Sequence, residues 1–308
     1  MAGAKLRGKM SQYFEIHWQE YRKHIDNAQN SKAIDEALKV LSERKKASPN
    51  EYKKDHKGTP FYVLGYAAFS SHDYSSASLY FDAAVEADLT YHGGKLNTPA
   101  LRFIQLLPDD SNPVLASGII SKITSTVEQL VQDYNSRAGS VSLTLDELRS
   151  RFFLKILQSG SKEQRALLTA FISFAAEWQY RNQQIDLVQS GSREPFFLHI
   201  FRGCLLFESL LKVHDNGKTL NPILHSLASR LGISSTSIST RENQFDNVLA
   251  GISTAMPIED AINSCVKARN TAGHNIVWTT PSLQPETYDL LIKNVSASCL
   301  HAISKLYV

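Results

Sequence analysis

The sequence predicts an all-α protein, and three observations support that prediction. Apolar residues recur at three- and four-residue intervals along most of the 308 residues, and sustained two-residue alternation is scarce. Gly and Pro are sparse, at 15 and 10 residues. The 43% hydrophobic and 20% charged fractions are typical of a folded globular chain. We therefore expect helical hairpins in residues 1–140 and an up-and-down helical bundle in residues 141–308.

The N-terminal region begins with two expected helices, over residues 11–29 and 31–47, and the second ends before Ser48-Pro49. A stretch rich in Lys and Arg, residues 39–57, overlaps the end of the second helix. It can be interpreted as a phosphate-binding edge or as a solvated helix end and loop. The interleaved acidic residues favour the solvated interpretation.

Residues 61–89 have the spacing of a helical hairpin. The small Gly65 and Ala77 let two helices approach, and Phe81 fills the gap between them. The segment resembles a tetratricopeptide repeat, although Leu89 stands where that repeat usually has Pro. The matching positions are Phe61, Leu64, Gly65, Tyr74, Ala77, Phe81 and Ala84. Because only the preceding helix aligns as a weaker half-repeat, we expect hairpins rather than an extended array, and the resemblance implies that they bind a partner protein or regulator.

The rest of the chain continues the helical pattern. A short helix is expected over 101–107 and a longer one over 114–135, and the polar segment 135–142 is the candidate linker. Ser239 and Glu242 have the spacing of a capping box at a helix start. The helices expected after the linker cover 144–158, 162–189, 196–214, 241–254, a motif-bearing segment after Pro257, and 286–307.

The segment Ile258–Trp278 has an unusual polar end. Its apolar residues recur at helical spacing until Arg269 takes the place of the next one; Asn270 follows, and His274 lies one helical turn beyond Asn270. An arginine on a buried helix seam is costly unless it is paired or exposed. Counting along the strongly apolar helix before it places Glu208 on the buried side, where it is the expected partner of Arg269. A partly exposed carboxylate is the alternative.

The run Arg269-Asn270-Thr271-Ala272-Gly273-His274 resembles the signature of HEPN-domain proteins. In that family an Arg and a His are separated by four to six residues, and a polar residue, often Asn, follows the Arg. The resemblance covers roughly residues 160–308. It implies a metal-independent endoribonuclease in which two protomers pair, so that their motifs face each other across one composite cleft.

The chemistry of RNA cleavage agrees with these residue types. RNA carries its own nucleophile, the 2′-OH, and His274 is the expected general acid/base because imidazole titrates near neutral pH. Arg269 is expected to stabilise charge on the phosphoryl oxygens, Asn270 to orient the reacting groups, and Glu208 to support Arg269. The expected products carry a cyclic phosphate and a 5′-hydroxyl.

Composition and cysteine use indicate a cytoplasmic protein. The three cysteines form no CxxC pair and lie in apolar helical patterns, which argues against a disulfide framework or a zinc site. The N-terminus lacks the apolar core of a signal peptide, and no run of residues is long enough to span a bilayer. We expect no metal, no other cofactor and no membrane contact. The formal net charge of +3 is compatible with an RNA partner without requiring one.

Two functions of different class fit these observations. One is a ribonuclease with a toxin or antiviral defence role, whose hairpins control access to the site or recruit a regulator. The other is a non-catalytic interaction protein, in which the hairpins bind a partner and the bundle only dimerises. The lack of HExxH, Walker-type, GxSxG and paired-carboxylate motifs disfavours polymerases, NTPases and metalloproteases. The scattered His199, His225 and His301 are expected at the surface or the edge of the core.

Overall fold

The computed structural model confirms the all-α class: every regular element among the residues it describes is helical. It describes residues 13–93, 97–108, 117–139, 142–188, 191–217, 219–235, 251–252, 256–272 and 283–307. The chain divides into two compact units, Met1–Ser121 and Lys122–Val308. The division falls within α7 (Ser117–Ala138), whereas the sequence analysis places it after residue 140. Across the described residues, no helix combines the length and the apolar character needed to cross a membrane.

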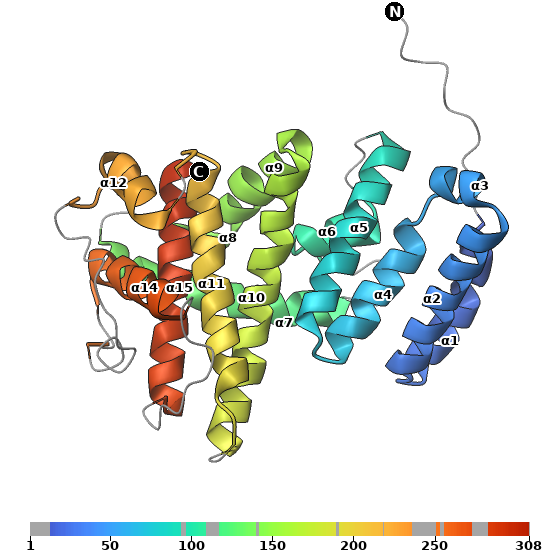
Figure 1. Ribbon diagram of the computed structural model, residues 1–308, viewed down its shortest axis with the longest axis horizontal. Helices are drawn as coiled ribbons and strands as arrows, with labels where there is room; N and C mark the ends of the chain where they lie inside the picture. The colour runs from blue at the N-terminus through green and yellow to red at the C-terminus, as the bar shows by residue number, and fades with distance from the viewer. Residues whose placement is uncertain are drawn as a thin grey trace, which may run out of the picture. The chain divides into compact units, whose positions relative to one another are not determined.

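The first unit is a stack of short helices, in which α1 and α2 pack against α4, and α4 packs against α5 and α6 (Figure 1). Its elements are η1 (Glu15–His17), α1 (Trp18–Asp26), α2 (Asn30–Ala47), α3 (Pro49–Lys54), α4 (Gly58–Ser70), α5 (Tyr74–His92) and α6 (Pro99–Ile104). The two helices expected over 11–29 and 31–47 correspond to η1 with α1, and to α2.

The basic stretch 39–57 contains a helix, α3, that the sequence analysis treats as loop. Pro49 starts this helix, because its first turn needs no backbone N–H donor. Arg44 donates from Nε to the buried Asp55 carboxylate at 2.7 Å. The Lys57 ammonium donates to the main-chain oxygens of Tyr52 and Asp55, both at 2.6 Å. These two cations therefore hold the stretch together, which does not favour the phosphate-binding interpretation.

Helices α4 and α5 pack as the small residues in the sequence predict. A Cβ atom added to Gly65 would lie 2.9 Å from Cδ1 of Phe81, so only glycine lets the two helices come this close. Phe81 is 1% exposed and stacks on Phe103 at 3.9 Å between ring centroids. Asp73 caps the start of α5 by accepting a hydrogen bond from the backbone N–H of Ser76 at 3.0 Å. The contact predicted between Gly65 and Phe81 is confirmed.

The second unit is built on α10, α11, α14 and α15: α11 and α15 pack against each other and against both α10 and α14, and α12 packs against α11 and α15 (Figure 1). Its elements are most of α7, then α8 (Leu145–Glu147), the π-helical η2 (Leu148–Leu154), α9 (Lys155–Ser159), α10 (Lys162–Leu187), α11 (Glu194–Lys212), α12 (Leu220–Leu231), α14 (Ile258–Ala272) and α15 (Pro285–Leu306). The helix expected over 241–254 and its capping box at Ser239 and Glu242 lie outside the described residues, apart from residues 251–252.

Segment 135–142, the expected linker, does not separate the two units. Its first residues form the last turn of α7. Asn135 then exchanges two hydrogen bonds with the main chain of Leu143, each 2.8 Å long. Thr144 and Glu147 form a capping box that starts the next helix at once. The division between the two units falls within α7 and not in this segment, and the described residues at its two ends are joined by the Asn135–Leu143 hydrogen bonds.

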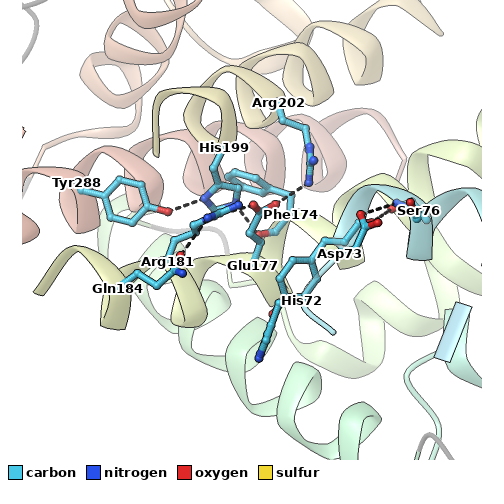
Figure 2. A network of polar contacts seen from close by, with 12 residues as sticks. His72, Asp73, Ser76, Phe174, Glu177, Arg181, Gln184, His199, Arg202 and Tyr288 are labelled. Carbon is cyan, nitrogen blue, oxygen red and sulfur yellow. Dashed lines mark hydrogen bonds and ion pairs between the residues drawn. The ribbon is translucent and has the colours of Figure 1, made fainter. Parts of the chain in front are cut away.

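Two histidine–tyrosine pairs lie in the core of the second unit. His199 donates from Nε2 to a main-chain oxygen of α10 at 2.9 Å, so its neutral Nδ1 accepts from the Tyr288 hydroxyl at 2.6 Å (Figure 2). His301 repeats the arrangement, with Nε2 2.7 Å from a main-chain oxygen of α12 and Nδ1 3.2 Å from the Tyr134 hydroxyl.

The expectation that these two histidines lie at the surface or the edge of the core is therefore wrong, because both are buried in the core, whereas His225 is exposed as predicted. Buried imidazoles are tolerated because both ring nitrogens have partners. Burial lowers the pKa of His199 to about 4, and it also lowers the pKa of His301.

Candidate functional site

The candidate site lies where α11 packs against α14. Glu208 of α11 is 3% exposed, which confirms the buried position and rules out the exposed alternative. Arg269 of α14 donates from Nε to Oε2 of Glu208 at 2.9 Å. The Lys212 ammonium lies 2.7 Å from the other carboxylate oxygen, Oε1. Both oxygens of the buried carboxylate are thus paired with cations, as burial of a charge requires.

Glu208 is ionised in this setting. Burial by itself would raise the pKa of its carboxyl group, but the hydrogen bonds from Lys212 and Arg269 outweigh that effect and bring the pKa below its usual value. A carboxylate with a lowered pKa is a poor proton donor at neutral pH. Glu208 therefore holds the arginine in place, and its supporting role in catalysis stays a prediction.

Arg269 is anchored and yet accessible. Its Nε is engaged by Glu208, Nη1 donates to Oδ1 of Asn270 at 3.4 Å, and the side chain is 29% exposed. Fixing one edge of a guanidinium lowers the entropy lost when the other edge binds an anion. The arrangement is that of a preorganised cation, which can bind a phosphate or another oxyanion.

The third predicted member of the site, His274, lies outside the described residues, as does Gly273. Helix α14 is described as far as Ala272, so Arg269 and Asn270 occupy its last described turn. The pairing of Arg269 with Glu208 and its contact with Asn270 are observed. The roles of all four residues in catalysis stay predictions.

Two features surround the anchored arginine. Beneath it, Cys204 and Cys265 are fully buried, and burial, together with the neighbouring Cys265, raises the pKa of the Cys204 thiol well above its usual value. Toward solvent, α11 presents Leu198 and Leu205, which are 49% and 39% exposed. Leu205 is three residues before Glu208 and so lies on the same side of the helix. A partly apolar surface therefore adjoins the ion pair.

A second buried carboxylate in the same unit shows that an ion pair alone does not define the site. Glu177 of α10 is 3% exposed, and its two oxygens lie 2.9 Å from Nε of Arg181 and 2.5 Å from Nη1 of Arg202 (Figure 2). The sequence analysis does not identify Glu177, because it lies within an aromatic-rich helix with no unusual spacing. What distinguishes Arg269 is its place in the motif beside Asn270.

The first unit contains a group of residues that the sequence analysis does not identify. A cavity of about 600 Å³ is lined by residues that include His56, Asp88 and His92. Asp88 and His92 are one turn apart on α5, which is the only signal in the sequence, because His56 precedes α4 and lies 32 residues before Asp88.

Comparisons with known proteins add no family to this description: no family model, no curated protein and no solved structure matches the chain. The residues described in the second unit bring together an ionised buried carboxylate, an anchored arginine and a neighbouring amide, which are groups suited to bind and orient an anion.

Proposed function

We propose that the chain is a metal-independent endoribonuclease of HEPN type that cleaves RNA by attack of the 2′-OH. The observation that supports this proposal is the anchored Arg269. It occupies the motif position that requires a fixed cation, its Nε is held by buried Glu208 at 2.9 Å, and its side chain is 29% exposed. A preorganised cation of this kind stabilises phosphoryl charge without reorganising during the reaction.

Each residue has one role in the proposed reaction. His274 takes the proton of the 2′-OH, directly or through water, and the oxygen attacks the adjacent phosphorus. Arg269 binds the non-bridging oxygens, and Asn270 orients the phosphate or the imidazole. The bond to the 5′-oxygen breaks, and this oxygen leaves with a proton from a histidine. The products carry a 2′,3′-cyclic phosphate and a 5′-hydroxyl.

The histidine that donates that proton can come from a second copy of the chain, because the proposed site is a composite cleft in a homodimer. The exposed Leu205, one turn before Glu208, and the exposed Leu198, two turns further toward the start of α11, support an interface on this side of the helix. In this proposal the hairpins of the first unit bind a regulator, and the enzyme acts in the cytoplasm as a toxin or antiviral effector.

A second candidate is a non-catalytic interaction protein. It is favoured by the close-packed α4–α5 hairpin at Gly65 and Phe81, whose spacing resembles a peptide-binding repeat. In that case the second unit only dimerises, and loss of Arg269 or His274 leaves function unchanged.

The deciding experiment is cleavage of mixed cellular RNA by the purified full-length protein in EDTA. We expect the wild type to leave cyclic-phosphate ends, and Arg269→Ala and His274→Ala each to reduce the rate by 10²-fold or more, roughly the effect of losing one acid/base or charge-stabilising group. Arg202→Ala is the matched control, because it also removes a cation from a buried carboxylate but lies outside the motif.

Three results would count against the proposal. If Arg202→Ala loses as much activity as Arg269→Ala, the loss is structural. If cleavage persists in Arg269→Ala and His274→Ala, the activity belongs to another site or a contaminant. Failure of the wild type to cleave any RNA, with a dimer seen in light scattering, favours the interaction protein.

A further inference from the structure

Three potential metal ligands converge in the first unit. The side chains of His56, Asp88 and His92 each bring one ligand atom to within 4.8 Å of the others. His56 and Asp88 are 9% and 4% exposed, and His92 is half-buried. All three line the cavity of about 600 Å³. We propose that these residues bind a divalent transition metal ion, with Zn²⁺ as the best match.

The ligand set has the chemistry of an open zinc site. Two imidazole nitrogens and one carboxylate oxygen are ligands that Zn²⁺ prefers, and three protein ligands leave a fourth position for water or a small ligand. The three residues line a cavity that can hold this water or small ligand and that Trp18, Arg22 and Tyr62 also line. A buried site that binds metal through all four positions would not need such a space.

The distances require only a small adjustment. Nε2 of His56 and Oδ1 of Asp88 are 2.8 Å apart, joined by a hydrogen bond. Two ligand atoms about 2.0–2.1 Å from a tetrahedral zinc ion are about 3.3 Å apart, so binding must open this pair by about 0.5 Å. The proton on Nε2 then moves to Nδ1, or to solvent if the imidazole is protonated.

Neighbouring side chains hold the three ligands in place. The Thr98 hydroxyl donates to Oδ2 of Asp88, which orients the carboxylate and leaves Oδ1 for the metal. Tyr91 stacks on the ring of His56 at 4.5 Å and meets the ring of His92 edge-on at 4.8 Å. Contacts of this kind fix the orientation of metal ligands and contribute to affinity.

Gly58 makes room for the pair. A Cβ atom added there would lie 1.9 Å from Oδ1 of Asp88 and 2.6 Å from Nε2 of His56. Any other residue at the start of α4 would push the carboxylate and the imidazole away from their present positions.

The test is a titration of the metal-free full-length protein with Co²⁺, followed by displacement with Zn²⁺. We expect one equivalent of Co²⁺ to give the visible absorption of a four- or five-coordinate ion. His56→Gln, Asp88→Asn and His92→Gln should each weaken binding by about 100-fold or more, because loss of a residue that only supports a ligand already costs about 10- to 100-fold. His92 is the most informative position, because it is half-buried and its replacement leaves the core intact.

His24→Gln is the matched control, since His24 lies on α1, where its ring nitrogen contacts Gln29, and it does not line the cavity. The His24→Gln variant should bind Co²⁺ with the same affinity as the wild type. The proposal is overturned if the wild type binds no Co²⁺, if the three variants bind as well as the wild type, or if a thiolate-to-cobalt band shows that the cysteines bind the ion. Because the RNA assay is run in EDTA, its failure and the failure of metal binding are distinguishable.

Discussion

At the scale of single residues, the buried partner of Arg269 is the most informative feature of the second unit. Counting along α11 gives an inward-facing Glu208 paired with Arg269 as one of two alternatives, because helical periodicity fixes which side chains share a face, and the structure selects it over an exposed carboxylate. The pairing of Lys212 with Glu208 follows from the four-residue spacing in the sequence, which places the two side chains one turn apart on the same helix. The cluster of His56 with Asp88 and His92 could not be predicted, because packing in three dimensions brings His56 to the other two across 32 or more residues of sequence.

The Glu208→Gln substitution tests two effects of Glu208: how it holds Arg269 for catalysis, and how much it contributes to the stability of the fold. The substitution keeps the shape of the side chain but leaves two cations beside a neutral amide. We expect the free energy of unfolding to fall by about 1–3 kcal/mol, as for loss of a charged hydrogen bond in a buried site. We also expect slower RNA cleavage, because Arg269 is no longer held. Urea unfolding and cleavage rates of the folded protein measure the two effects.

Glu177→Gln is the control for that experiment, because Glu177 is buried to the same extent and is likewise paired with two cations. It should lose similar stability and keep the cleavage rate of the wild type. Equal loss of cleavage in both variants would show that Glu208 has no specific role in the site.

At the scale of elements, the helices predicted best are those with clear start signals. Ser161 and Gln164 form a capping box at the start of α10, and Pro285 occupies the first turn of α15. Helix α12 was missed because Asn221-Pro222 is typical of a loop, yet a proline within the first turn of a helix costs no hydrogen bond. Sequence signals thus specify helix ends well where a side chain forms the cap, and poorly where packing decides.

Gly65→Ala tests the close approach of α4 and α5. The added Cβ would lie 2.9 Å from the ring of Phe81, which cannot move away easily because it stacks on Phe103. We expect the free energy of unfolding to fall by about 1–3 kcal/mol, the usual cost of overpacking. Thermal or urea unfolding followed by circular dichroism measures this change.

Gly118→Ala has the opposite expected sign. Gly118 lies in the first turn of α7, and an added Cβ there meets no atom of the residues that the structure describes within 4 Å. Alanine should leave stability unchanged or raise it by up to about 1 kcal/mol through helix propensity. If Gly65→Ala is as harmless as Gly118→Ala, the contact with Phe81 does not constrain the hairpin.

At the scale of the whole molecule, buried histidines link the stability of the second unit to pH. The second unit has the two histidine–tyrosine pairs in its core, and burial favours the neutral form of both imidazoles by lowering their pKa. Two such pairs link the acid stability of the unit to the titration of its core. The sequence offered no sign of this, because each histidine is separated from its tyrosine by 89 or 167 residues.

We therefore expect stability to fall in mild acid. The pKa of His199 is about 4 in the folded chain, below its ordinary value of 6.5, so the unfolded chain binds more protons between these values. The free energy of unfolding should then decrease as the pH falls from about 6.5 toward 4, and His199 should contribute on the order of 2 kcal/mol of loss between pH 7 and pH 5. Urea unfolding at these two pH values measures it.

His199→Gln should be less stable at pH 7 and should lose less on going to pH 5, because it removes one titrating group. His225→Gln is the control, since His225 is exposed, and it should behave as the wild type. If the stability of His199→Gln depends on pH as that of the wild type does, the loss of stability in mild acid does not come from His199.

The three buried thiols allow the opening rate of the second unit to be measured by chemical labelling. Cys204, Cys265 and Cys299 are the only cysteines of the chain, and all are shielded within helices of that unit. A thiol reagent can reach them only when the unit opens. The rate of labelling, measured at high reagent concentration, is therefore the opening rate of this unit, and the thiol-free first unit contributes no signal.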